Sequence, residues 1–459
     1  MSSVALFPTC AAELMFNLDF WLASVPQGKA ALAIDLPKEF LLTCVAFSLL
    51  GALVASKLVS TVRIPSIVGV LLLGALISPN AASFSPGVVD LLHAFSLAML
   101  LFYEGLRTDF TLIRGQLGYG IALAIGGVVV SSSVLGILIW LVYQLIAGNV
   151  PGTDMLVLPI GVCFMMAACI GSTDAGATMN VLRSITDVMP ARLRSIVQLE
   201  STINDPTAFL FLSIVIGLVV SPVSGGMRFE TQLADFLQEI ANGILIGLIL
   251  TYVAQLVLVH VVSGRDQILV VGVSIAMASY GLASLFGGSG FISAYVTGLF
   301  LSNNVYENRL ITPELLENSF EPFNTLTELS VFLMFGILID PSQIPQAIPE
   351  GLAIALCLML IARPLSVLVY QFRSPLSLRE SLLVSWCGLR GAVPLALTYE
   401  VVHVIPQMRG LSAVQAESYQ VEVTSVIFVV VVFNLLIQGI SLPMVARRLL
   451  GLTPQADKG

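Results

Sequence analysis

Long apolar runs alternate with short polar turns along this chain. Thirteen runs can be delimited, at about residues 40–56, 64–78, 88–106, 118–147, 155–182, 194–220, 237–262, 267–286, 290–302, 324–339, 347–371, 380–402 and 422–446. A transmembrane helix needs about 20 mostly apolar residues, and the runs lack the period-two alternation of a transmembrane β-barrel. The pattern predicts an all-α polytopic membrane protein with about thirteen transmembrane helices, which we number spans 1 to 13.

Composition excludes several classes of protein. Only 10% of the residues are charged, 57% are hydrophobic and the mean hydropathy is +0.96, whereas a soluble domain carries about 25% charged residues. A soluble enzyme and a disordered chain are therefore excluded. The net charge of −8 argues against nucleic acid as a partner.

The positive charges predict the orientation of the chain in the membrane. If the N-terminus lies outside, fourteen Lys and Arg residues fall in cytoplasmic turns and four fall outside, and Arg363 and Arg390 lie within apolar runs. Cytoplasmic loops of membrane proteins carry the excess of Lys and Arg. We therefore expect residues 1–38 to be extracytoplasmic, residues 39–447 to form the transmembrane domain and residues 448–459 to be a short cytoplasmic tail.

Two spans are interrupted in their middle. Span 5 contains the polar, small-residue sequence GSTDAGA, and span 12 contains CGLRGAVP with two glycines and a proline. The two spans lie seven apart and so cross the membrane in opposite directions, which suggests an inverted repeat of spans 3–7 and 10–13. Paired broken helices indicate a transporter site near the membrane midplane, although either helix alone could be an ordinary glycine-kinked one.

Charged side chains from three spans reach a similar depth. With a rise of about 1.5 Å per residue, Asp205 lies about 16 Å, Asp174 about 14 Å and Arg363 about 15 Å from the inner surface. A core about 30 Å thick places all three near its midplane. Because charges are costly there, random placement would not put the three at one depth.

Spacing within span 6 separates two roles. Ser201 and Asp205 are four residues apart and share one helix face, while Glu200 and Asn204 share the neighbouring face. The oxygens of Thr173, Asp174, Ser201 and Asp205 suit a hard monovalent cation, and a carboxylate there holds either a cation or a proton. Glu200 needs a buried cationic partner, for which Arg363 is the arginine at similar depth.

Alternatives remain open for other residues. Asp174 could instead cap the second half of span 5, and Glu104 could be a solvated residue near the inner interface. Arg390 either pins the broken helix through free carbonyls or takes a direct part. The three histidines lie near the ends of apolar runs, where an interfacial position is expected.

Four motifs in order resemble the monovalent cation/proton antiporters, in particular the NhaP-type bacterial sodium/proton antiporters and the animal sodium/proton exchangers. They are S-T-D-A in span 5, E-S-x-x-N-D in span 6, A-R-P in span 11 and G-L-R-G-A-V-P in span 12. The resemblance covers nearly the whole chain. It implies an exchanger domain over 39–447 with a core around spans 4–6 and 11–13, two crossed broken helices, a dimerisation scaffold made of the other spans, and homodimers working by elevator-like alternating access.

The resemblance also implies roles for single residues. Asp205 would bind the cation and the proton in competition, with Asn204 as its partner in the Asn-Asp pair typical of electroneutral members. Further cation-binding residues would be Thr173, Asp174, Ser201 and Glu104, with a sodium ion held by Asp205, Asp174, Ser201 and Thr173. Glu200 and Arg363 would form a structural ion pair, and Arg390 would serve the broken helix. Pro206 stands in place of the glycine common after the Asn-Asp pair, as in some potassium/proton relatives, and leaves the choice between sodium and potassium open.

We expect a secondary antiporter of a bacterial inner membrane that exchanges Na+, and also Li+, for H+, with K+/H+ antiport as the alternative. No cofactor is expected beyond the transported ions. A cation channel is a hypothesis from another class, but the sequence lacks a filter resembling TVGYG. An intramembrane enzyme is disfavoured because neither HExxH nor a GxSxG elbow is present.

Overall fold

The computed structural model describes residues 38–61, 66–77, 86–108, 117–149, 157–182, 189–220, 229–304, 312–408 and 410–451. The predicted extracytoplasmic segment, except Lys38, and the predicted tail beyond Gly451 lie outside these residues. Within them no strand is present, and each of the thirteen predicted runs contains a helix. Six helices are long and apolar enough by themselves to cross a membrane.

Seven of the thirteen predicted spans each contain one helix and lie outside the two groups of three spans described next. They are α2 (Lys38–Thr61), α3 (Ser66–Ile77), α4 (Pro86–Arg107), α11 (Phe229–His260), α12 (Arg265–Leu285), α13 (Gly290–Ser302) and α14 (Pro313–Leu338). The helix α14 begins eleven residues before the predicted run, because its first turns carry glutamates that hide the helix from a hydropathy reading. Thr312 caps this beginning by accepting a hydrogen bond from the Leu315 N–H.

The other six spans form two triplets with the same plan. The first triplet is α6 (Leu117–Ile121), η2 (Ala122–Gly126) and α7 (Gly127–Asn149); α8 (Ile160–Cys169) and α9 (Ala175–Val181); and α10 (Ala191–Val220). The second is α15 (Ile344–Cys357), η4 (Leu358–Ala362) and α16 (Arg363–Leu368); α17 (Leu378–Trp386) and α18 (Ala392–Val404); and α19 (Ala413–Leu450), with short 3₁₀ turns at Gln371–Arg373 and Ile405–Gln407. Each triplet thus has a helix with a π-helical segment, a broken helix and a long helix, which is the pattern of an inverted repeat.

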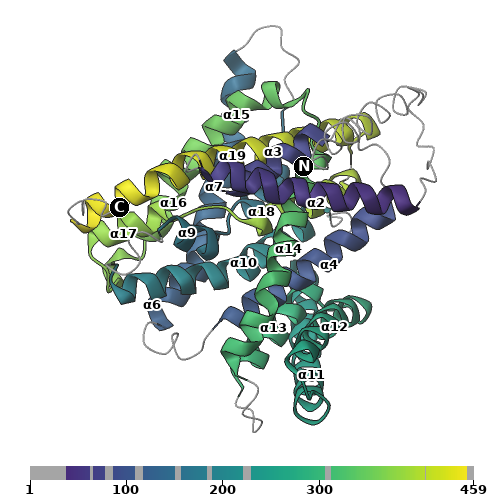
Figure 1. The fold of residues 1–459 in the computed structure, drawn as a ribbon. Helices are drawn as coiled ribbons and strands as arrows, with labels where there is room; N and C mark the ends of the chain where they lie inside the picture. The colour runs from purple at the N-terminus through teal and green to yellow at the C-terminus, as the bar shows by residue number, and fades with distance from the viewer. Residues whose placement is uncertain are drawn as a thin grey trace, which may run out of the picture.

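Buried apolar side chains form two clusters. One is built from α4, α11, α12, α13 and α14, and the larger one involves the two triplets together with α2 and α3. In Figure 1 the helices α11, α12 and α13 form a group to one side, with α4 and α14 leading from it to the rest of the molecule. The helices α4 and α14 therefore lie where the two clusters meet.

Glycines allow close packing where these helices meet. A Cβ atom on Gly105 of α4 would lie 2.7 Å from the backbone nitrogen of Leu299 in α13, and one on Gly74 of α3 would lie 2.8 Å from the Cα of Gly336 in α14. Small residues at such contacts are typical of membrane helices, because backbone approach and van der Waals packing supply the association energy. This packing joins α4 closely to α13 and α14 closely to α3.

Candidate functional site

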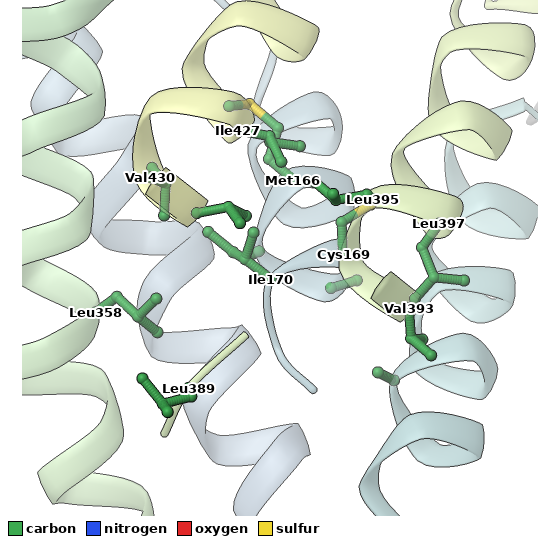
Figure 2. Packing of buried hydrophobic residues seen from close by; sticks show 14 of the residues in the cluster. Met166, Cys169, Ile170, Leu358, Leu389, Val393, Leu395, Leu397, Ile427 and Val430 are labelled. Atoms are coloured by element: carbon green, nitrogen blue, oxygen red, sulfur yellow. The ribbon is translucent and has the colours of Figure 1, made fainter. Parts of the chain in front are cut away.

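The interruptions of spans 5 and 12 meet in the middle of the molecule. The Asp174 N–H donates to the Leu389 carbonyl oxygen at 2.8 Å, and the Thr178 hydroxyl donates to the Cys387 carbonyl oxygen at 3.3 Å. Figure 2 shows Met166, Cys169 and Ile170 from one break and Leu389 and Val393 from the other within one apolar cluster that also includes Ile427 of α19. The two broken helices therefore cross at their interruptions, and apolar side chains of both pack together there.

Arg390 neutralises the carbonyl end of the first break. Its side chain is fully buried, and its guanidinium donates to the carbonyl oxygens of Gly171, at 3.0 Å, and of Ser172. The end of an α-helix leaves backbone carbonyls without partners and carries partial negative charge. No ion pair involves Arg390 within the described ranges, so of the two alternatives the geometry corresponds to the one in which Arg390 pins the broken helix.

Two side chains of α10, which is span 6, form hydrogen bonds with Thr173 in the interruption of span 5. The Asn204 amide donates to the Thr173 hydroxyl oxygen at 2.5 Å and accepts from the Thr173 N–H at 3.3 Å. The Ser201 hydroxyl donates to the Thr173 carbonyl oxygen. Both polar atoms of the Asn204 amide are thus used to hold Thr173 in place.

Glu200 and Arg363 form a buried bidentate ion pair. The distances are 2.5 Å from Nη1 to Oε1 and 2.8 Å from Nη2 to Oε2, and the side chains of Glu200 and Arg363 are 3% and 4% exposed. Arg363 follows the π-helical segment η4, and a Cβ atom on Gly388 would lie 3.3 Å from its Nε. The pair predicted from depth is therefore present and joins α10 to α16 beside the second break.

A cavity lies against the crossing, between the breaks and the helices α4 and α14. Its free volume of about 20 Å³ accommodates one water-sized particle. The lining includes five of the predicted cation-site residues, Glu104, Thr173, Asp174, Ser201 and Asp205, together with Leu100, Glu328, Gly391, Ala392, Val393 and Pro394. Asn204 is not part of this lining, since its amide faces Thr173. Oxygen atoms of carboxylates and hydroxyls dominate the polar part of the lining, as a hard cation requires.

Asp205 is the most deeply placed carboxylate that was predicted for the site. It is 7% exposed, and within the residues that the structure describes it forms no ion pair. It shares its helix face with Ser201, one turn earlier, as the spacing predicted. A buried carboxylate without an ion-pair partner can hold either a proton or a cation.

Asp174 caps a helix and also lines the cavity. Its Oδ1 accepts a hydrogen bond from the Ala177 N–H at 2.9 Å and so caps α9, while the side chain also lines the cavity. Its Cβ and Cγ lie 2.8 and 2.9 Å from where a Cβ atom of Gly391 would be, so only glycine fits at that position. The cap uses one carboxylate oxygen, and the other carboxylate oxygen is left for the cavity.

For Asp174→Asn we therefore expect a folded protein with a weakened cation site. The amide oxygen can keep the cap on Ala177, but the charge in the cavity is lost, so the apparent KM for the cation should rise about tenfold. Cation-dependent proton flux in proteoliposomes measures this change. Wild-type KM and maximal rate in this variant would leave Asp174 with capping as its whole role.

Glu104 is tied to a neighbouring cationic side chain. Arg107, one turn later on α4, lies 3.5 Å from Glu104 Oε1 through Nη1 and 3.7 Å from Glu317 Oε1 of α14 through Nε. Glu104 nevertheless lines the cavity. Glu104 therefore lines the cavity while it is paired with Arg107.

Sequence reasoning missed two features. Glu328 lies within the predicted run 324–339 and lines the cavity, and the rule that intramembrane charges are costly should have singled it out. His93 was expected at an interface, but it is 3% exposed and its Nε2 lies 3.0 Å from Glu400 Oε1, which joins α4 to α18. No local signal pairs two residues 307 positions apart.

A sequence profile described as "Sodium/hydrogen exchanger, transmembrane" matches residues 45–448. The chain belongs to the sodium/hydrogen exchanger family. It is 29% identical to the K(+)/H(+) antiporter NhaP2 of Shewanella oneidensis over 88% of this chain and 67% of that protein, and 26% identical to the Na(+)/H(+) antiporter NhaS2 of Synechocystis over 91% and 72%.

The fold of this exchanger-family member also matches a solved structure. The sodium proton antiporter MjNhaP1 of Methanocaldococcus jannaschii has a TM-score of 0.73 at 20% identity, with 89% of this chain and 98% of that chain covered. The prediction of an all-α antiporter fold with two crossed broken helices is thereby confirmed. The protein is an integral, multi-pass membrane transporter that exchanges a monovalent cation for protons, and not an enzyme.

Proposed function

We propose that the protein carries out electroneutral exchange of one monovalent cation for one proton, with both ions competing for Asp205 in the cavity. The proposal is supported by one observation above all: a buried carboxylate without an ion pair among the described residues shares a small oxygen-lined cavity with Asp174, Ser201 and Thr173. The cation is cargo, so no resident metal is required. Alternating access would carry the loaded site from one side of the membrane to the other.

Competition gives the test of this mechanism. In proteoliposomes, lowering the pH by one unit where the site is mostly protonated should raise the apparent KM for the cation about tenfold, because one proton excludes one cation. The maximal rate at saturating cation should change little. At high pH the rate at fixed cation should fall again for lack of protons, which gives a bell-shaped profile. A KM independent of pH across the acidic limb would contradict competition at one carboxylate.

Sodium, with lithium, is the first candidate for the cation because the family profile is that of sodium/hydrogen exchangers. Potassium is the second candidate, supported by Pro206 and by K(+)/H(+) antiporters among the relatives, including the NhaP of Alkalimonas amylolytica at 28% identity over 86% of this chain. The same flux assay with Na+, Li+ and K+ compared at equal concentration decides between them. Cation flux without proton movement would favour a channel instead.

Location and assembly complete the proposal. The relatives in Shewanella support a bacterial inner membrane, and the distribution of Lys and Arg supports an N-terminus outside and a C-terminus in the cytoplasm. Homodimer formation stays a prediction of the family resemblance, as does the division into a moving core and a dimerisation scaffold.

A further inference from the structure

Glu328 adds a carboxylate to the cavity from a helix outside the two triplets. It belongs to α14, whereas Thr173, Asp174, Ser201 and Asp205 belong to span 5 and α10. Across the described part of the chain, no three His, Cys, Asp or Glu side chains converge closely enough to hold a single metal ion. Glu328 therefore lines the cavity from its α14 side, beside the carboxylates of the other helices.

Asn324 holds Glu328 in place and carries a side-chain oxygen that lacks a hydrogen-bond donor among the described residues. The Asn324 amide nitrogen donates to Glu328 Oε1 at 2.6 Å, one helical turn away. Asn324 is 7% exposed, and its own side-chain oxygen is buried without a hydrogen-bond partner in the described residues. Buried polar atoms are nearly always paired, and two oxygen-bearing side chains one turn apart on one helix face suit a hard cation.

The same face of α14 carries further acidic residues toward the N-terminal end of the helix. Glu314, Glu317 and Glu321 precede Asn324 and Glu328 at spacings of three and four, so that all five fall within an arc of about 80° on the helix. Glu314 and Glu321 are exposed, and Glu317 is partly buried beside Arg107. Such a stripe concentrates cations near its path, and it ends at the cavity.

We propose that Glu328, held in place by Asn324, is a further cation-binding residue of this exchanger. It contacts the monovalent cation from the α14 side of the cavity that Asp205 also lines. This inference rests on the proposed function, in which Asp205 is the carboxylate that exchanges cation for proton. Glu328 then contributes to cation affinity but not to the coupling with protons, which remains with Asp205.

The test is the KM of purified, full-length variants in proteoliposomes, with Na+ and K+ as the probes. Glu328→Gln should raise the apparent KM about tenfold and keep the maximal rate within about twofold, since it removes binding shared by ground state and transition state. The dependence of KM on pH should remain. Asn324→Ala should raise KM by a smaller factor. Glu422→Gln is the matched control, because Glu422 is a part-buried carboxylate bonded to the Tyr143 hydroxyl at 2.7 Å and lies outside the cavity lining.

Results with the Glu328 variants test the role of Glu328, and results with Asp205→Asn test the proposed function. A folded Glu328→Gln protein with wild-type KM, or with a lower maximal rate at unchanged KM, overturns the role of Glu328. Glu328→Asp keeps the charge one methylene shorter and should change the ratio of the KM values for Na+ and K+; it carries the test if the glutamine variant does not fold. Failure of both variants to fold assigns Glu328 to helix packing and overturns the inference. Exchange that survives in Asp205→Asn counts against the proposed function instead.

Discussion

Purified Asp205→Asn protein should be folded and unable to exchange cations for protons. The amide is nearly isosteric with the carboxylate, and the side chain takes part in no ion pair among the described residues, so the substitution leaves no stranded charge. An amide cannot release and bind a proton in the physiological range, and it binds a monovalent cation far more weakly than a carboxylate does. Loss of exchange by a factor of at least about a thousand is therefore expected.

The measurement needs proof of folding beside the flux. Thermal unfolding and gel filtration in detergent should match the wild type, while cation-driven proton flux in proteoliposomes disappears. Asp266→Asn is a suitable control, because Asp266 is exposed in the first turn of α12 and lies outside the cavity lining. Robust exchange by folded Asp205→Asn protein would refute the mechanism whatever the family membership suggests.

Much of the fold was predictable because membranes impose strong rules on sequence. Continuous apolar runs define spanning helices, and interruption by small and polar residues marked the breaks at 170–174 and 387–391. Depth counting from the nearest cytoplasmic arginines brought Asp174, Asp205 and Arg363 to one level, and the structure places all three around the crossing. These arguments succeeded because they need only the spacing of residues along one helix and the position of the inner membrane surface.

Other features depend on contacts that spacing does not encode. The π-helical segments η2 and η4 leave no hydropathy signature, although they identify spans 4 and 11 as equivalent. The hydrogen bonds of the Asn204 amide to Thr173 of span 5 are not indicated by the spacing within span 6. Arg390 could not be assigned until the carbonyls of Gly171 and Ser172 were placed. For Asn204 and Arg390 the partner comes from a different span, and helix packing decides which residue it is.

Breaking the Glu200–Arg363 pair is expected to have the largest effect on stability. Both side chains are buried, and Nη2 of Arg363 also reaches the Val384 carbonyl oxygen of α17 at 3.5 Å. Removing one partner leaves the other charge buried without compensation, at a cost of about 3–5 kcal/mol. Glu200→Ala and Arg363→Ala should therefore lower the melting temperature and the yield strongly, whereas the apparent KM for the cation in the surviving folded protein should change by no more than about threefold.

A double-mutant cycle distinguishes a stranded charge from lost packing. If the cost of each single change comes from the uncompensated partner, Glu200→Gln combined with Arg363→Met should be more stable than either single variant, because no buried charge remains. Arg363→Lys should rescue only in part, since an ammonium group cannot make the two parallel hydrogen bonds that Arg363 makes. Thermal unfolding in detergent, followed without added cation, measures all four variants. Additive losses in the double variant, or wild-type melting temperatures in both alanine variants, would show that the ion pair does not hold α10 against α16.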